Sequence, residues 1–234
     1  MKFAYFGYRE WAEDILTDIQ DSKFDIKSFT TKSGEYTLSA KERSNEIDPK
    51  NLSFDSLKEF DAIMFYGWSW IVPKKIIDSV PCVCLHPSPL PKYRGGSPIQ
   101  NQIMAGEDTS AVSLFKMGEE LDDGPLYYQE PFSLEGDLYE VLGRMREVGT
   151  DLTRKLLDDF ESGTVKEHSQ DESRATYCKR RTGAQSEISS GDFDKMTARQ
   201  IHDHIRSLQD PYPNAYITGS DGKKVYITGS RLEE

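Results

Sequence analysis

The sequence predicts an α/β protein whose sheet is mainly parallel and covered by helices on both faces. Two observations carry this prediction. Short apolar runs alternate along the chain with segments of helical period, and the first unit reads as a strand, a tight turn at Gly7 and an amphipathic helix. Strands that alternate with helices form parallel sheets with helices on either side. A length of 234 residues is that of one ordinary domain with a small appendage.

The first half of the chain supplies three strands and three helices. In the first helix Trp11, Ile15 and Ile19 recur four residues apart, as on one helix face. Residues 31–51 are polar and are expected to form a loop or a short irregular insertion. The expected strands span residues 2–6, 61–66 and 82–85, and the expected helices span residues 10–19, 53–60 and 74–80.

The second half begins with Ser97-Pro98, a serine that is expected to cap a helix ending at Gly106. Two strands follow, joined by the acidic turn 118–124, and a long helix runs from Asp137 to a stop at Gly163. The remaining elements are strands over residues 111–117 and 125–132, a helix over residues 197–208, and a hairpin around Asp221-Gly222. We therefore expect a main domain over residues 1–180 and a small C-terminal α+β extension over residues 181–234.

Charge and cysteine content restrict the partners and the compartment. The 29 basic and 40 acidic residues give a net charge of −11, which disfavours nucleic acid as a partner. The basic cluster 178–181 is either a solvated surface or an anion contact. The sequence has neither a membrane-spanning run nor a signal peptide, and its three cysteines have no disulfide spacing. These features predict a cytoplasmic protein without structural disulfides.

Ligands of such sheets collect beyond the carboxyl ends of the strands. That rule places the loops over residues 67–73 and 86–96 side by side as the rim of a site. Within them Cys82, Cys84 and His86 alternate on one side of a strand, which raises the question of a metal. Residues two apart on a strand are about 6.6 Å apart along its axis, too far to converge on one zinc ion. We therefore expect no metal site.

Acid–base chemistry is the second interpretation of His86. It ends one strand, and the turn that holds Asp122 adjoins another, so the two side chains can meet over the sheet edge. A loop histidine bonded to backbone, beside a solvated acidic turn, is the alternative that periodicity by itself favours.

A resemblance extends beyond periodicity. The segment HPSPLPKYRGGSPIQNQI is similar to the H-P-S-x-L-P-x-Y-R-G-x-x-P-I motif of the 10-formyltetrahydrofolate-dependent formyltransferases. The segment LDDGPLYYQ resembles that family's L-D-x-G segment. FAYFGYREWA, FYGWSWIVP, RRTGAQSEIS and RQIHDHIRSLQDPYPNAYI are similar as well, so the resemblance covers nearly the whole chain except residues 31–55.

The resemblance implies a Rossmann-like formyltransferase fold and formyl transfer from 10-formyltetrahydrofolate to an amine, without a metal. It implies catalytic roles for His86 and Asp122, while the position of the family's catalytic Asn is Cys84 here. A thiol is a poor substitute for an amide that donates to an oxyanion. Cys84 is thus a weak donor, a packing residue or a nucleophile. The residues expected to contact the folate are Trp68, Ser69, Trp70, Ile71, Val72, Ser88, Leu90, Pro91, Lys92 and Tyr93, with core packing as the alternative for the two tryptophans.

Similar enzymes formylate either initiator methionyl-tRNA or a nucleotide-linked amino sugar. The acidic charge and the short segment after residue 180 favour the sugar nucleotide, whose phosphates would contact Lys92, Arg94 or residues 179–181. The sequence is also compatible with a formyltetrahydrofolate hydrolase and with a weakened folate-binding scaffold. The acceptor's identity and homodimer formation are left open by the sequence.

Overall fold

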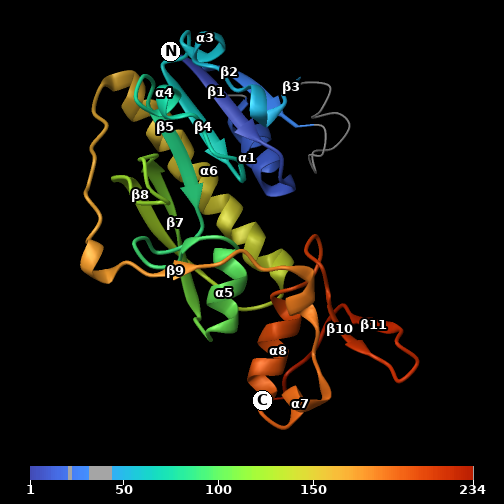
Figure 1. The fold of residues 1–234 in the computed structure, drawn as a ribbon. Coiled ribbons are helices and arrows are strands. Elements are labelled where there is room, and N and C mark those ends of the chain that lie inside the picture. The colour runs from blue at the N-terminus through green and yellow to red at the C-terminus, as the bar shows by residue number, and fades with distance from the viewer. Residues whose placement is uncertain (21–22, 32–43, 234) are drawn as a thin grey trace.

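The computed structural model describes residues 1–20, 23–31 and 44–233, and its centre is a seven-stranded sheet (Figure 1). The strand order is β3-β2-β1-β4-β5-β7-β8. The first five strands in this order are parallel, and β7 and β8 are antiparallel to their neighbours. The strands in this order span Asn45–Glu46, Asp25–Thr30, Lys2–Gly7, Ala62–Tyr66, Cys82–His86, Thr109–Lys116 and Leu126–Ser133. The predicted mainly parallel α/β sheet is confirmed.

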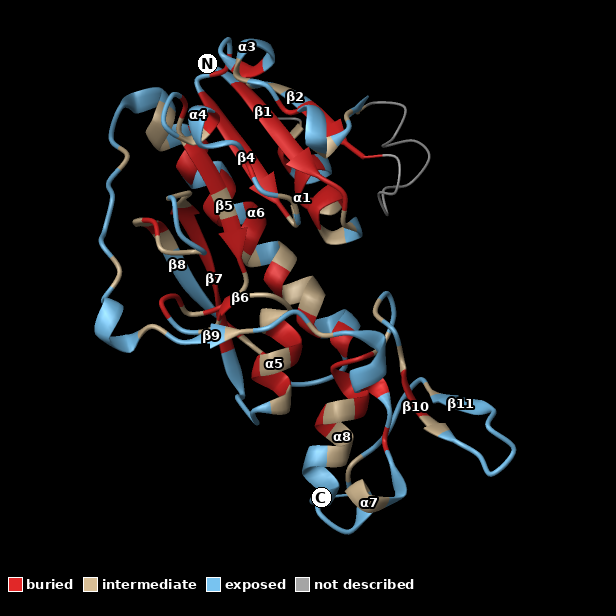
Figure 2. Cartoon of the chain, in the orientation of Figure 1, coloured by how far each residue is buried: buried red, intermediate tan, exposed pale blue. Residues whose placement is uncertain are grey.

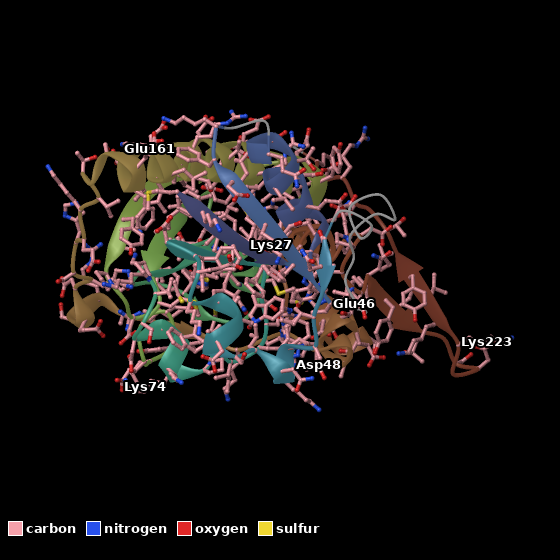
Figure 3. The ribbon with its side chains drawn as sticks, turned by 90° about the horizontal axis from the view of Figure 1, so that it is seen from above. Lys27, Glu46, Asp48, Lys74, Glu161 and Lys223 are labelled. Atoms are coloured by element: carbon pink, nitrogen blue, oxygen red, sulfur yellow. The ribbon has the colours of Figure 1, made fainter. Side chains whose placement is uncertain are left out.

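Helices cover both faces of the sheet, and the side chains of β1 alternate between the two cores. Phe3 and Tyr5 pack beneath α1 (Glu10–Gln20) and α6 (Leu138–Ser162), whereas Ala4 and Phe6 face the core beneath α3 (Phe54–Leu57) and α4 (Lys74–Ile77). Figure 2 shows the strands buried between these layers, and in Figure 3 Glu161 of α6 and Lys74 of α4 lie on opposite sides of the sheet. A strand buried on both faces reads as a continuous apolar run, which is why β1 and β4 could be predicted.

Some elements differ from the prediction. Strand β2 was not expected, because only its last three residues are buried and its first half is polar. Helix α4 ends at Ile77, three residues before the predicted end, and the chain continues as a turn to Val80, where the following Pro81 disfavours helical geometry. Helix α3 is likewise short: its chain turns after Leu57 so that Phe60 can enter the core.

The expected insertion at residues 31–51 is irregular where it is described, with two residues in β3 and a 3₁₀ turn at Pro49–Asn51. Residues 32–43 of that prediction lie outside the described residues.

The predicted cap of α5 (Pro98–Met104) is wrong. Ser97 has a left-handed backbone (φ 52°) and its hydroxyl makes no cap hydrogen bond; instead Ser97 Oγ accepts from the Arg181 amide at 3.1 Å. By contrast, Asp137 caps α6 through a reciprocal pair with Glu140, and Gly163 ends the helix with a left-handed backbone. A tertiary contact thus takes the Ser97 hydroxyl away from its local role.

The C-terminal segment contains α7 (Ser190–Phe193), α8 (Ala198–Arg206) and the predicted hairpin of β10 (Ala215–Thr218) and β11 (Lys224–Ile227). Helix α8 packs on α5, and the buried Arg206 donates to the carbonyls of Leu134 and Gly136 before α6. On this basis we propose that the main domain ends at residue 180 and that the C-terminal extension, residues 181–234, packs on it through helix α8. No helix in the described ranges combines the length and apolar character needed to cross a bilayer.

Candidate functional site

The candidate site lies at the carboxyl end of β5, where the chain leaves the sheet at His86. His86 is 6% exposed, and its Nδ1 is 3.5 Å from Asp122 Oδ2. Asp122 lies in the turn between β7 and β8, which pair antiparallel beside β5. Strand order therefore brings together two residues that are 36 apart in the chain.

The turn that carries Asp122 has a tightly constrained backbone. Asp122 itself has a positive φ of 53°, which is unfavourable for a residue with a side chain, and its Oδ2 accepts from the Gly95 amide at 2.8 Å. Gly124 lies so close to β7 that an added Cβ would be 1.7 Å from the Lys116 carbonyl oxygen. The glycine of the L-D-D-G segment is therefore a steric requirement.

Both nitrogens of the His86 ring face oxygen atoms. Nε2 is 2.8 Å from the Tyr93 carbonyl oxygen, which can only accept, so Nε2 carries a hydrogen. In the neutral ring, Nδ1 would then direct a lone pair at the Asp122 carboxylate. A proton held between Nδ1 and Asp122, on either atom, removes that repulsion. The geometry therefore suits hydrogen bonding between Nδ1 and the carboxylate, as general acid–base chemistry requires.

Cys84 is half-buried on β5, two residues before His86. Its sulfur is 3.7 Å from the Leu85 carbonyl oxygen. Burial, and secondarily the Asp122 carboxylate, raise the pKa of the Cys84 thiol well above its usual range. A protonated thiol is a poor nucleophile, so the environment argues against covalent chemistry here.

The loop after β4 forms an aromatic wall beside the sheet edge. The Trp68 ring packs on Phe6 at 5.5 Å and on Trp70 at 4.8 Å, and Trp70 in turn contacts Tyr8 at 4.9 Å between ring centroids. Trp68 is thus largely part of the core, as one of the two interpretations had it. Its Nε1 is buried and has no hydrogen-bond partner among the described residues.

The other predicted residues of this loop differ in exposure. Ser69 is exposed, and its hydroxyl lies 2.6 Å from both Tyr8 Oη and Arg180 Nη2. Ile71 is 93% exposed, whereas Val72 is buried in the core.

The loop after His86 is held largely by its own residues. Ser88 is fully buried, donates to the Lys92 carbonyl at 2.7 Å, and accepts from Ser113 at its own carbonyl. Leu90 and Pro91 are buried as well. Their side chains have structural roles, so a ligand would meet the exposed Lys92 and the half-buried Tyr93 instead.

The sequence named residues 179–181 as a candidate phosphate contact, but it gave no indication that residues 170–178 of the same segment reach the site. Arg94, expected as a phosphate contact, is 1% exposed and pairs with Glu172 and Gln170, so it is unavailable to a ligand. Arg180, from the predicted cluster 179–181, is exposed and reaches Ser69 in the loop after β4. The basic residues that follow Cys178 were the signal available in the sequence, but they did not indicate which residues this segment contacts.

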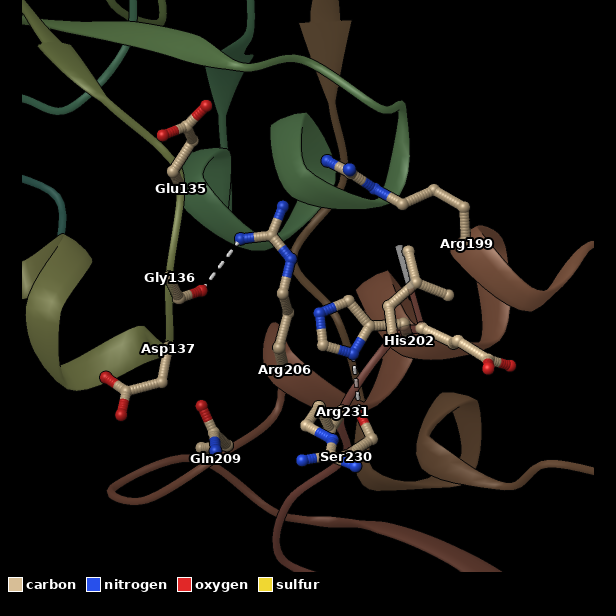
Figure 4. A pocket seen from close by; sticks show the side chains of 11 residues that line it. Glu135, Gly136, Asp137, Arg199, His202, Arg206, Gln209, Ser230 and Arg231 are labelled. Carbon is tan, nitrogen blue, oxygen red and sulfur yellow. Dashed lines mark hydrogen bonds between the residues drawn. The ribbon is translucent and has the colours of Figure 1, made fainter.

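Within the described residues, no group of three or more His, Cys, Asp or Glu side chains converges on a metal position. A cavity of about 450 Å³ lies elsewhere, between the start of α6 and α8 (Figure 4). Arg206 in its wall already bonds Asp203, Leu134 and Gly136, and His202 bonds Ser230. None of the predicted site residues lines this cavity, so the geometry at His86 is the better candidate for chemistry.

A histidine and a carboxylate that lie 3.5 Å apart at the carboxyl end of a mainly parallel α/β sheet form a candidate acid–base site of an enzyme. The profile of the family described as Formyl transferase matches residues 9–148, and that described as Formyl transferase, C-terminal domain matches residues 187–234. The chain belongs to the formyl transferase family, as the sequence motifs predicted.

The relatives include a methionyl-tRNA formyltransferase from Sulfurimonas denitrificans, 31% identical over 82% of this chain, and one from Macrococcus caseolyticus, 32% identical over 74%. The chain spans 62% and 56% of the lengths of these two relatives.

Two solved structures have the same fold. A sugar N-formyltransferase from a Shewanella species matches with a TM-score of 0.77 and 18% identity over 100% of both chains. HypX from Aquifex aeolicus, in complex with tetrahydrofolic acid, matches with a TM-score of 0.78 and 17% identity over 98% of this chain and 37% of that one. At these identities the likeness shows the fold alone.

Proposed function

We propose that the protein transfers a formyl group from 10-formyltetrahydrofolate to the amine of a small acceptor, most simply an amino sugar linked to a nucleotide. The observation that carries the proposal is the 3.5 Å approach of His86 Nδ1 to Asp122 Oδ2 within the two segments that match the family's motifs. We further propose His86 and Asp122 as catalytic residues and Cys84 as the third residue of the site.

The residues after β4 fit a bound pterin. Trp70 and Tyr8 form an aromatic edge, and Trp68 Nε1 is a buried donor without a partner among the described residues, which an acceptor on the ligand would satisfy. Residues 68–72, Lys92 and Tyr93 would hold the folate, with Ser88, Leu90 and Pro91 fixing the loop from beneath. The folate supplies an activated formyl group on nitrogen.

The chain's own residues then manage one proton. As the unprotonated amine attacks the formyl carbon, the proton between His86 and Asp122 is donated toward the developing oxyanion. Asp122 accepts the proton that the amine loses as its new bond to carbon forms. Asp122 passes that proton to the folate nitrogen as the old carbon–nitrogen bond breaks, and the proton on the former oxyanion returns to the pair as the carbonyl re-forms, so the pair regains its starting state. Because direct attack of the amine on the formyl carbon needs no thiol, Cys84 acts either as a packing residue or as a weak hydrogen-bond donor to the oxyanion.

The acceptor proposal is supported by charge. A net charge of −11 repels a polyanion, while Arg180 and Lys92 are exposed near the loops and suffice for the few phosphates of a nucleotide. Methionyl-tRNA is the second candidate acceptor, because the two relatives from Sulfurimonas and Macrococcus are described as methionyl-tRNA formyltransferases.

Substitution of the proton-sharing pair tests the proposal. We expect His86→Ala and Asp122→Asn each to lower single-turnover formyl transfer by at least about 10²-fold with nearly unchanged folate binding, as for groups that act in the transition state. Near-normal turnover in either variant contradicts the assigned roles.

An acceptor panel distinguishes the candidate activities. Amino-sugar nucleotides should be formylated faster than methionyl-tRNA, and efficient tRNA formylation with a steep salt dependence would overturn the acceptor proposal. Release of tetrahydrofolate without any acceptor would indicate a hydrolase. Folate binding without turnover on any acceptor would indicate a scaffold.

A further inference from the structure

A segment between α6 and the C-terminal extension crosses the site and contacts both the loop after His86 and the turn that holds Asp122. We call this segment, residues 168–178, the strap. It is orange in Figure 1 and ends in the short strand β9 (Tyr177–Cys178). At one end His168 exchanges two backbone hydrogen bonds with Leu126 at the start of β8. At the other end β9 pairs with β6 (Arg94–Gly95) in the loop after His86.

Gln170 of the strap reaches the turn that holds Asp122. Its Nε2 donates to the Asp122 carbonyl at 2.9 Å and to the Gly124 carbonyl at 2.7 Å. These two bonds use both hydrogens of the amide. They hold the backbone on either side of Asp123, in the turn where Asp122 has a positive φ.

Arg94 decides which way the Gln170 amide points. Gln170 Oε1 accepts from Arg94 Nη2 at 2.8 Å and from Nε at 3.3 Å. A guanidinium has donors only, so the amide oxygen must face Arg94 and the NH₂ group must face the two carbonyls. Arg94 is itself fixed by a two-point pair with Glu172, at 2.6 and 2.9 Å.

We propose that Gln170, oriented by the buried Arg94, is a positioning residue that fixes the Asp122 carboxylate beside His86. The chain of contacts is continuous: Arg94 orients Gln170, Gln170 holds the Asp122 backbone, and Asp122 Oδ2 then meets both the Gly95 amide and His86 Nδ1. The catalytic part of this inference rests on the proposed formyl transfer. The positional part concerns the structure alone.

The contrary view is that Gln170 merely stabilises the strap. Two variants separate the views. Gln170→Glu keeps an oxygen for Arg94 but directs a second oxygen at two carbonyls, and Gln170→Leu removes all four bonds. Gln209→Leu is the matched control, because Gln209 also binds two backbone groups, Leu138 N and Thr228 O, but lies in the C-terminal extension.

The first readout needs no activity. Exchange of the Gly95 amide hydrogen, followed by NMR, reports whether Asp122 still accepts from it. We expect at least about tenfold faster exchange in both Gln170 variants at unchanged exchange of the β1 and β4 amides, and no change in Gln209→Leu. Unchanged Gly95 exchange in a folded Gln170→Glu protein overturns the proposal.

The second readout is a double-mutant cycle with 10-formyltetrahydrofolate and the amino-sugar nucleotide that supports turnover. A displaced carboxylate is expected to lower kcat by about 10- to 100-fold at nearly constant KM for the folate. In the Asp122→Asn background the same Gln170 substitution should cost less than about threefold, since there is no carboxylate left to position. Equal losses in both backgrounds would mean a general structural role. A wild-type enzyme without turnover would instead refute the proposed function and leave the Gly95 measurement to decide the positional inference.

Discussion

Replacing Cys84 gives the sharpest test of the mechanism, because this residue stands where similar enzymes have an asparagine. The perturbation is a set of three variants, Cys84→Ala, Cys84→Ser and Cys84→Asn. Burial, and then the Asp122 carboxylate, raise the pKa of the Cys84 thiol well above its usual range, so the thiol stays protonated at neutral pH. A group so rarely ionised contributes little as a nucleophile.

The expected magnitudes follow from this environment. Cys84→Ala removes one half-buried sulfur atom and should keep activity within about fivefold of wild type, at a stability loss of about 1 kcal/mol. Cys84→Asn adds a donor of the kind that contributes about 10²- to 10³-fold in rate elsewhere, offset by about 1–3 kcal/mol of overpacking. We therefore expect it to be tolerated or to gain activity.

The assay is single-turnover formyl transfer, combined with mass spectrometry of the wild-type protein quenched during the reaction. Cys82→Ala is the control, because Cys82 lies on the same strand and face as Cys84 but is fully buried, and its pKa is raised by burial alone. A formyl adduct on Cys84 together with an inactive Cys84→Ala variant would refute the direct route.

Three further predictions follow from single residues. Gly124→Ala should destabilise the protein by at least about 2 kcal/mol in urea unfolding, because the added Cβ would clash with the Lys116 carbonyl oxygen. The control is Gly143→Ala on α6, where no atom lies near the added Cβ, and it should stabilise the protein by roughly 0.5–1 kcal/mol. Equal effects of the two substitutions would contradict the steric argument. Burial raises the pKa of the Cys178 thiol from 9.0 to about 11. Between these values the unfolded chain loses the thiol proton while the folded protein keeps it. The contribution of this thiol to the free energy of unfolding is therefore fully present below about pH 9 and is lost toward pH 11. The difference in Tm between wild type and Cys178→Ala should therefore shift against the wild type over that window, and a constant difference would rule this out. Arg180→Ala should raise KM for a phosphate-bearing acceptor about tenfold with little change in kcat, because one charge-assisted hydrogen bond to the acceptor is lost. An unchanged KM would show that Arg180 does not contact the acceptor.

The elements that could be predicted from the sequence are those whose own residues carry the signal. Strands β1, β4 and β5 are short apolar runs, and α6 has both a helical period and matching end signals at Asp137 and Gly163. Strand β2 escaped prediction because half of it is polar and it is stabilised by pairing with β1. The predicted helix cap at Ser97 was wrong for a related reason. The Ser97 hydroxyl accepts a hydrogen bond from the Arg181 amide, 84 residues away, and not from the helix that it precedes.

The sequence by itself determined the fold class, the family and the two segments that bear His86 and Asp122, because motifs and hydrophobic period are local properties of the chain. Only the tertiary structure decided the surroundings that set their chemistry: that Arg94 is buried against the strap rather than exposed to a phosphate, that Ser88 builds its loop, and that Gln170 holds the Asp122 turn. The physical reason is separation along the chain. Gln170 lies 48 residues from Asp122 and 76 from Arg94, and hydrogen bonds of single polar side chains over such distances leave no periodic pattern to read.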